Sequence, residues 1–172
     1  MKKLTEIIGF NGEILHTREA VRAVLFREDR RIPILYVARY GYHKLPGGGV
    51  DAGENHIEAL FREISEEVGD QSILEIDGGA FGYVVEHKLE HKEEEKPPTR
   101  QTSYCYRGTI QPGGETHFTE KEELNEFELK WMTLSEAIEA LTADKPSFWE
   151  GQMILERDLA FLHEVKQVLG ED

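Results

Sequence analysis

Residues 48–69 read GGVDAGENHIEALFREISEEVG, and this stretch decides how the whole chain is interpreted. A glycine-rich turn leads into an amphipathic helix that carries Glu63, Glu66 and Glu67 at positions i, i+3 and i+4. Side chains with that spacing are neighbours on a helix surface. Clustered carboxylates repel one another unless a cation joins them, and oxygen ligands suit Mg²⁺ or Mn²⁺. Because a bound metal can clamp phosphate oxygens and activate water, the spacing indicates hydrolysis of a phosphoanhydride.

The same helix also has the pattern of an ordinary surface helix. Its apolar residues form a stripe typical of packing against a core: Ile57, Leu60, Phe61, Ile64 and Val68. At about 100° per residue, Glu63 and Glu67 flank this stripe, whereas Glu66 lies opposite it. Neighbouring loops can cover the two flanking positions. A solvated acidic face remains the alternative interpretation of the helix taken alone.

The wider pattern resembles the Nudix box, which has the form G, five residues, E, seven residues, R-E-aliphatic-x-E-E-x-G-aliphatic. Its fixed positions are occupied in this chain by Gly48, Glu54, Arg62, Glu63, Ile64, Glu66, Glu67 and Gly69. Only the last position differs, because Asp70 stands where the family has an aliphatic residue. This departure follows the helix, so it concerns local packing rather than the carboxylates. The chain is identified on this basis as a member of the Nudix hydrolase family.

The resemblance implies a role for each polar residue of the box. Glu63 and Glu67 would ligate a divalent metal, Mg²⁺ or Mn²⁺, and Glu66 would support that ion or share a second one. Gly47 would offer its backbone carbonyl to the metal. Arg62 would orient the glutamates. Glu63 would act as the base that takes a proton from the attacking water.

Residues outside the box are needed to complete such a site. In the family a distal carboxylate often joins the metal ligands, and the candidates here are Glu120, Glu122, Glu123 and Glu126. Possible phosphate contacts are Arg39, Lys44 and Arg107. The aromatic residues that could stack on a base are Tyr40, Tyr42, His43, Tyr83, Phe148 and Trp149.

The composition fits one compact enzyme domain over residues 1–172, with an N-terminal hairpin extension at about 1–17. A net charge of −14 argues against nucleic acid as a general partner. It also gives the metal a second purpose, since the ion supplies positive charge for an anionic substrate. No apolar run approaches a membrane span and the N-terminus lacks a signal-peptide core, so the expected location is cytoplasmic. Cys105, the single cysteine, cannot form an internal disulfide.

The order of predicted elements favours an α/β fold, a Nudix-type α/β/α sandwich with a central mixed sheet. Asn11-Gly12 predicts a hairpin at 6–15 that offers an edge for a possible homodimer. Strands are predicted at 20–26, 34–38, 81–86, 103–110 and 127–132. One helix is predicted from a Ser135 cap to Leu141 and another over 149–169, whereas 87–101 is predicted to be a long exposed loop.

We therefore expect metal-dependent hydrolysis of the phosphoanhydride bond of a nucleoside diphosphate linked to another group. The substrate is a small nucleotide, with a (deoxy)nucleoside triphosphate preferred. One alternative is a Nudix module that binds a nucleotide without cleaving it, although all the acids of the box are present. A remote alternative is a zinc protease, because residues 87–91 read HKLEH and match H-x-x-E-H. That pattern requires a helix, and this segment follows the strand-like sequence GYVVE.

Overall fold

The computed structural model describes residues 1–89 and 97–170. The described strands are β1 (Lys2–Ile8), β2 (His16–Phe26), β3 (Arg31–Val37), β4 (Tyr42–Lys44), β5 (Ile73–Ile76), β6 (Gly82–Lys88), β7 (Thr99–Gln111) and β8 (Phe127–Thr133). The described helices are α1 (His56–Glu67), α2 (Glu120–Leu124), α3 (Leu134–Ala143) and α4 (Trp149–Leu169). None of these helices combines the length and apolar character that crossing a bilayer requires.

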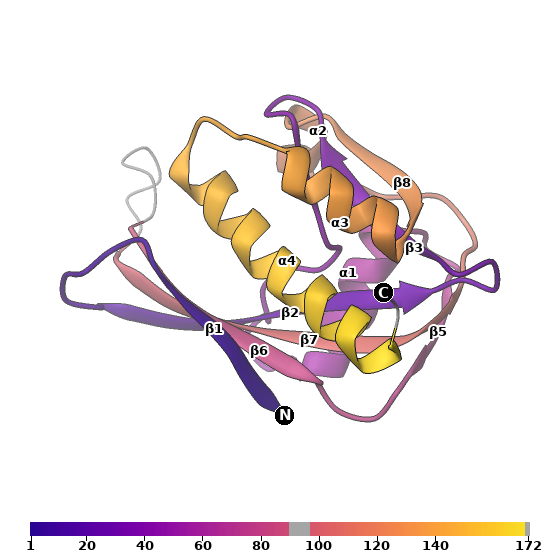
Figure 1. Ribbon diagram of the computed structural model, residues 1–172, viewed down its shortest axis with the longest axis horizontal. Helices are drawn as coiled ribbons and strands as arrows, with labels where there is room; N and C mark the ends of the chain where they lie inside the picture. The colour runs from indigo at the N-terminus through magenta and orange to yellow at the C-terminus, as the bar shows by residue number, and fades with distance from the viewer. Residues whose placement is uncertain (90–96, 171–172) are drawn as a thin grey trace.

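The strands form two sheets between helical layers (Figure 1). The larger sheet has the order β1-β6-β7-β2, and β5 pairs with the far end of β7. It is mixed, because β1 runs parallel to β6 and β2 parallel to β7, whereas β6 and β7 are antiparallel. The smaller sheet is antiparallel with the order β4-β3-β8. Helix α1 packs behind β2, and α3 and α4 cover the opposite side (Figure 1). The predicted α/β/α sandwich with a mixed sheet is confirmed.

Strand β2 contributes to both core layers because its side chains alternate between the two faces. Val21, Ala23 and Leu25 pack with α1, whereas Val24 and Phe26 pack with α3 and α4. All five side chains are buried. The strand therefore connects the helix of the Nudix box with the C-terminal helices that lie across the sheet.

Helix α1 begins with a capping box. The side chain of Asn55 accepts from the backbone of Glu58, and the Glu58 carboxylate accepts from the Asn55 amide at 2.8 Å. The buried face of the helix contains Ala59, Leu60, Glu63, Ile64 and Glu67. The predicted apolar stripe is wrong at Ile57 and Phe61, which are exposed. The helix is rotated so that two glutamates, rather than these two apolar residues, face the protein.

The predicted N-terminal hairpin is wrong. Strand β1 pairs in parallel with β6, from Lys2 opposite Gly82 to Ile8 opposite His87, and it does not pair with β2. Residues 9–15, which include the Asn11-Gly12 turn signal, connect two strands that lie apart in the sheet. β1 is an edge strand, so the edge that could pair with a second copy is present without a hairpin. Formation of a homodimer stays a prediction.

Other element boundaries differ because tertiary contacts extend or move them. Strands β6 and β7 continue to Lys88 and from Thr99, into the segment predicted as a loop. Residues 90–96 lie outside the described residues. His87 is in β6, so the H-x-x-E-H segment is not helical at its start, while Glu90 and His91 lie outside the described residues. Helix α3 is capped by Thr133 instead of Ser135.

Candidate active site

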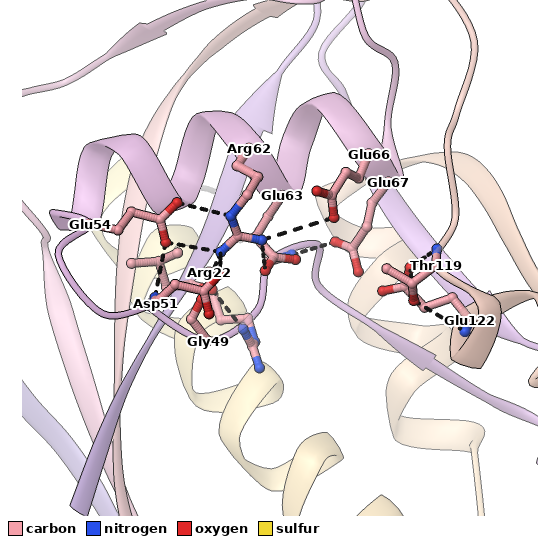
Figure 2. Close-up of polar contacts among 12 residues, drawn as sticks. Arg22, Gly49, Asp51, Glu54, Arg62, Glu63, Glu66, Glu67, Thr119 and Glu122 are labelled. Carbon is pink, nitrogen blue, oxygen red and sulfur yellow. Dashed lines mark hydrogen bonds and ion pairs between the residues drawn. The ribbon is translucent and has the colours of Figure 1, made fainter.

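Arg62 connects the parts of the Nudix box. Its Nε and Nη2 atoms donate to the two carboxylate oxygens of Glu54 at 2.9 and 3.0 Å, and Nη1 donates to Oε1 of Glu63 at 2.7 Å (Figure 2). Nη2 also donates to the carbonyl of Gly49 at 2.9 Å. Hydrogen bonds to Glu54, and then to Glu63, raise the pKa of Arg62 above its usual value. A planar guanidinium thereby fixes the glycine-rich loop, the helix entry and Glu63 relative to one another.

Glu67 is a fully buried carboxylate at the end of α1. Its Oε2 atom accepts from the amide of Gly47 at 2.6 Å, and Oε1 lies 3.0 Å from Nζ of Lys44. Burial raises the pKa of Glu67 to about 7, although Lys44 opposes this shift and Glu63 adds to it. The carboxylate therefore lies where further positive charge would stabilise its ionised form.

The backbone of the glycine-rich loop is held against β2. The carbonyls of Pro46 and Gly48 accept from the amides of Ala23 and Val21, at 3.2 and 2.9 Å. Between them, the carbonyl of Gly47 accepts no hydrogen bond from the described residues. Gly47 has a φ of +124°, and a Cβ there would lie 2.2 Å from the Val21 carbonyl. Only glycine fits this close approach, and it leaves one carbonyl available to a ligand.

The three glutamates gather on one side of α1, as the spacing predicts (Figure 2). In their present contacts, no group of three or more His, Cys, Asp or Glu side chains among the described residues is arranged to hold a metal. Glu63 is bound to Arg62, and Glu67 is bound to Lys44 and the Gly47 amide. Burial and the neighbouring charge of Glu63 raise the pKa of Glu66. Three mutually repelling carboxylates beside a free carbonyl form a donor set that fits Mg²⁺ or Mn²⁺.

A pocket of about 730 Å³ adjoins these groups, a size that suits a nucleotide. Its acidic side chains include Glu63 and Glu122. The aromatic residues that line it are Tyr40, Tyr42, Phe127 and Phe148. The basic residues that line it are Arg18, Arg22, Lys44, Lys121 and Arg157. The ring of Phe148 lies 5.1 Å from that of Tyr40 and 5.8 Å from that of Tyr42, measured between centroids. The pocket thus presents an aromatic side together with cationic groups.

Of the three predicted phosphate contacts, one lines the pocket and two do not. Lys44 lines the pocket and pairs with Glu67. Arg39 is not among the lining residues, because its Nη1 atom donates to the Leu124 carbonyl at 3.1 Å. Arg107 pairs with Asp77 at 2.8 Å and also lies outside the pocket.

Among the possible distal ligands, only Glu122 lines the pocket. Its carboxylate caps α2 by accepting from the amide of Thr119 at 2.8 Å (Figure 2). The charge of Glu122 contributes to the raised pKa values of Glu66 and Glu67, although it is a minor cause in both. Glu120, Glu123 and Glu126 are not among the lining residues.

Of the six aromatic candidates, three line the pocket and three do not. Tyr40, Tyr42 and Phe148 line the pocket, and burial raises the pKa of Tyr42 to about 12. His43 instead contacts Asp144, with 2.9 Å between Nδ1 and Oδ2. Two others lie elsewhere: Tyr83 lines a separate open hollow, and Trp149 packs against the hydrophobic core.

Two pocket residues, Arg22 and Arg157, were not predicted from the sequence. Arg22 interrupts the apolar run AVRAVLF at 20–26, and its side chain is buried in β2. Arg157 lies four residues after Met153 and four before Phe161, so it occupies the apolar face of α4. The sequence did contain a signal for both arginines. Each is a charged residue at a position where the spacing of the apolar residues predicts an apolar side chain.

Comparison with known proteins agrees with this geometry. The family profile described as NUDIX domain matches residues 16–150. The chain belongs to the NUDIX domain family. The Nudix fold is also found in a MutT protein from Bacillus halodurans, at 20% identity over 85% of this chain and 82% of that chain, with a TM-score of 0.53. A MutT protein from Methanosarcina mazei Go1 covers 94% of this chain and 100% of its own at 16% identity, with a TM-score of 0.54. At these identities the likeness concerns the fold alone.

Two curated relatives match shorter segments of this Nudix protein. An RNA pyrophosphohydrolase from Tolumonas auensis is 46% identical over 43 residues, which are 24% of this chain and 25% of that protein. An RNA pyrophosphohydrolase from Shewanella sediminis is 50% identical over 38 residues, 21% of this chain and 22% of that protein. The matched segments span about a quarter of the length of these relatives or slightly less.

Proposed function

We propose that this Nudix protein hydrolyses the phosphoanhydride bond of a nucleoside diphosphate linked to another group, in a reaction that depends on a divalent metal. One observation carries the proposal. Glu63, held by Arg62, lines a pocket that also presents aromatic rings and buried arginines. Acid, cation and aromatic surface are the groups that a hydrolase of nucleotide anhydrides requires.

The box residues have distinct roles in this proposal. Glu63, Glu66, Glu67 and the Gly47 carbonyl would hold Mg²⁺ or Mn²⁺, which when bound screens phosphate charge and makes water more acidic. Glu63 takes the proton from the attacking water, because it is the box glutamate that lines the pocket. Arg62 keeps the carboxylate of Glu63 in place.

Glu122 is the distal carboxylate in this proposal. It lines the same pocket as Glu63 and lies close enough to Glu66 and Glu67 to influence their pKa values. Its second function, the cap of α2, holds the side chain in position before any ligand binds.

The preferred substrate class is a (deoxy)nucleoside triphosphate, cleaved to a nucleoside monophosphate and pyrophosphate. The rings of Tyr40, Tyr42 and Phe148 offer a surface on which a base can stack. The names of the curated relatives support pyrophosphate chemistry. The net charge of −14 favours a small nucleotide over a polyanionic RNA.

A panel of compounds tests the proposal. Purified protein with and without Mg²⁺ is assayed on nucleoside triphosphates, nucleotide sugars, ADP-ribose, dinucleoside polyphosphates and an RNA oligonucleotide with a 5′-triphosphate. We expect Mg²⁺-dependent cleavage of a small nucleotide and a loss of at least about 100-fold in kcat in Glu67→Gln. Glu156→Gln, an exposed acid on α4, is the matched control and keeps the wild-type rate. Failure to cleave any member of the panel, or full activity of Glu67→Gln, contradicts the proposal.

A further inference from the structure

A cluster of buried charged side chains adjoins the pocket. We call Arg22, Glu86, Arg157 and Asp158 the interior charge cluster; they come from β2, β6 and α4, and all four are buried. Nε of Arg157 donates to Oδ1 of Asp158 at 2.7 Å, and Nη1 lies 3.6 Å from Oε1 of Glu86. Both arginines of the cluster also line the pocket that contains Glu63.

The arginines are incompletely satisfied. Nη1 of Arg22 donates to the neighbouring Val21 carbonyl at 2.6 Å, but its buried Nε has no hydrogen-bond partner among the described residues. Nη2 of Arg157 is likewise buried without a partner within the described residues. Unpaired guanidinium N–H groups are costly to bury, because water that would otherwise solvate them is excluded. Two such groups beside one pocket indicate that a ligand completes their hydrogen bonds.

The charges in this region are also unbalanced. Arg22, Arg157 and the neighbouring Lys88 face two carboxylates, Glu86 and Asp158. An anion that enters the pocket would offset this excess of positive charge.

Most of the nearby carboxylate oxygens are already engaged. The exception is Oε1 of Glu86, which is buried without a hydrogen-bond partner among the described residues and lies 3.6 Å from Nη1 of Arg157 and 3.5 Å from Nζ of Lys88. Oδ2 of Asp158 accepts from the amide of Leu45 at 2.9 Å, and Oε2 of Glu86 accepts from Ser103 and Gln101 at 2.7 and 2.8 Å. Glu67 also attracts Arg22, but it is paired with Lys44. The excess positive charge therefore remains for a group that enters through the pocket.

We propose that Arg22 and Arg157 form an anion site that receives a phosphate group of the substrate lying beyond the cleaved anhydride. The inference rests on the proposed function and narrows the substrate class to compounds with such a phosphate, as in a nucleoside triphosphate. Phosphate oxygens would accept hydrogen bonds from the two guanidinium groups that line the pocket and would supply the missing negative charge. Guanidinium groups are suited to this role, because they stay protonated and bind phosphate with planar, paired donors.

Calorimetry with inorganic pyrophosphate in excess EDTA tests the anion site without any metal. The full chain is compared with Arg22→Gln and Arg157→Gln, and Arg107→Gln is the control because that residue pairs with Asp77 outside the pocket. We expect wild-type protein and the control to bind pyrophosphate, and both pocket variants to bind at least about tenfold more weakly. If Arg157→Gln fails to fold, the test uses Arg22→Gln and Arg22→Lys instead. We expect Arg22→Lys to keep part of the affinity for pyrophosphate. No binding to wild-type protein, or unchanged binding to folded Arg22→Gln, overturns the inference.

Steady-state kinetics separate this inference from the proposed function. With Mg²⁺ and whichever triphosphate is cleaved, Arg22→Gln should raise KM by about tenfold or more and change kcat less, whereas Glu67→Gln should lower kcat. Metal-free binding that depends on Arg22 in a protein that cleaves nothing would support the anion site and reject the proposed activity. If turnover depends on Glu67 but pyrophosphate binding is unchanged in Arg22→Gln, the anion site alone is rejected.

Discussion

At the scale of single residues, the site depends on carboxylates placed where a helix normally buries apolar groups. Glu63 and Glu67 lie on the buried face of α1 among Leu60 and Ile64. Arg62 and Lys44 neutralise them in part, through contacts of 2.7 and 3.0 Å. A buried carboxylate is tolerated only with such partners. The acids are therefore held in position by contacts within the protein itself.

The first prediction concerns the contact between Gly48 and Glu63. A Cβ on residue 48 would lie 2.2 Å from Oε1 of Glu63, so Gly48→Ala must displace the carboxylate. We expect kcat for the nucleotide that is cleaved to fall by about tenfold or more, because small displacements of a catalytic group are costly. Gly79→Ala is the control, since nothing lies within 4 Å of a Cβ there. Equal rates for the two variants would show that the position of Glu63 does not matter.

The residues of the site were predictable from sequence to the extent that a local motif contains them. The box specifies Arg62 and its neighbours, but it leaves open whether Arg62 pairs with Glu58, with Glu54 or with a catalytic carboxylate. The structure pairs Arg62 with both Glu54 and Glu63, whereas Glu58 takes part in the helix cap. Arg22 and Arg157 meet only through the fold, from β2 and α4, so no local pattern brings them together.

At the scale of elements, caps and long-range pairing decide the boundaries. Asp70, which departs from the Nudix pattern, follows α1 and accepts from the amide of Glu115 at 3.1 Å. Its other oxygen lies 3.1 Å from Nε2 of His117. The departure thus replaces an apolar contact with polar contacts that hold the loop after β7. Strands and helices whose apolar residues repeat with a strong local period were predicted. The pairing of β1 was not, because its partner β6 begins about 80 residues later.

The second prediction concerns the start of α3. Oγ1 of Thr133 accepts from the amide of Glu136 at 3.2 Å, and the Glu136 carboxylate accepts from the Thr133 amide at 2.8 Å. Thr133→Ala should lower the free energy of unfolding by about 1 kcal/mol, the usual contribution of an N-cap. Ser135→Ala should change it by less than about 0.5 kcal/mol, because Ser135 is exposed inside the helix. Urea denaturation of both variants measures the difference, and a larger effect at Ser135 would restore the cap expected from the sequence.

At the scale of the whole molecule, the α4 helix and the Nudix box are joined through the sheet. Asp158 of α4 binds the amide of Leu45, which directly precedes the glycine-rich loop. The helix therefore supports the loop as well as one side of the pocket. The two faces of β2 are packed by α1 and by the C-terminal helices, so the pocket forms only when the complete sandwich is assembled.

The third prediction concerns the pH dependence of stability through Glu86. Burial opposes its charge, but Arg157, Lys88 and Ser103 together lower its pKa to about 2 from 4.5. A carboxyl group with a lowered pKa in the folded protein stabilises the fold above its unfolded value. That contribution is lost as the pH falls from about 4.5 through about 2, and it amounts to about 3 kcal/mol at 1.36 kcal/mol per pKa unit.

Denaturation between pH 7 and pH 2 measures this contribution. Glu86→Gln should be less stable than wild-type protein at pH 7, because Arg157 loses one of its two charged partners and keeps only Asp158. The difference between the two proteins should shrink as the pH falls. The exposed α3 residue Glu139, changed to Gln, serves as the control and should follow the wild-type curve. A constant difference at all pH values would mean that the pKa of Glu86 is the same in the folded and the unfolded protein.

The most direct measurement for the account as a whole is a crystal soaked with Mn²⁺ and examined by anomalous scattering. We predict a peak bounded by the carboxylates of Glu63 and Glu67 and by the carbonyl of Gly47, with the same peak absent in Glu67→Gln. The contrary result is a map without a peak at this position, in which Glu67 remains bound to Lys44 and Glu63 to Arg62.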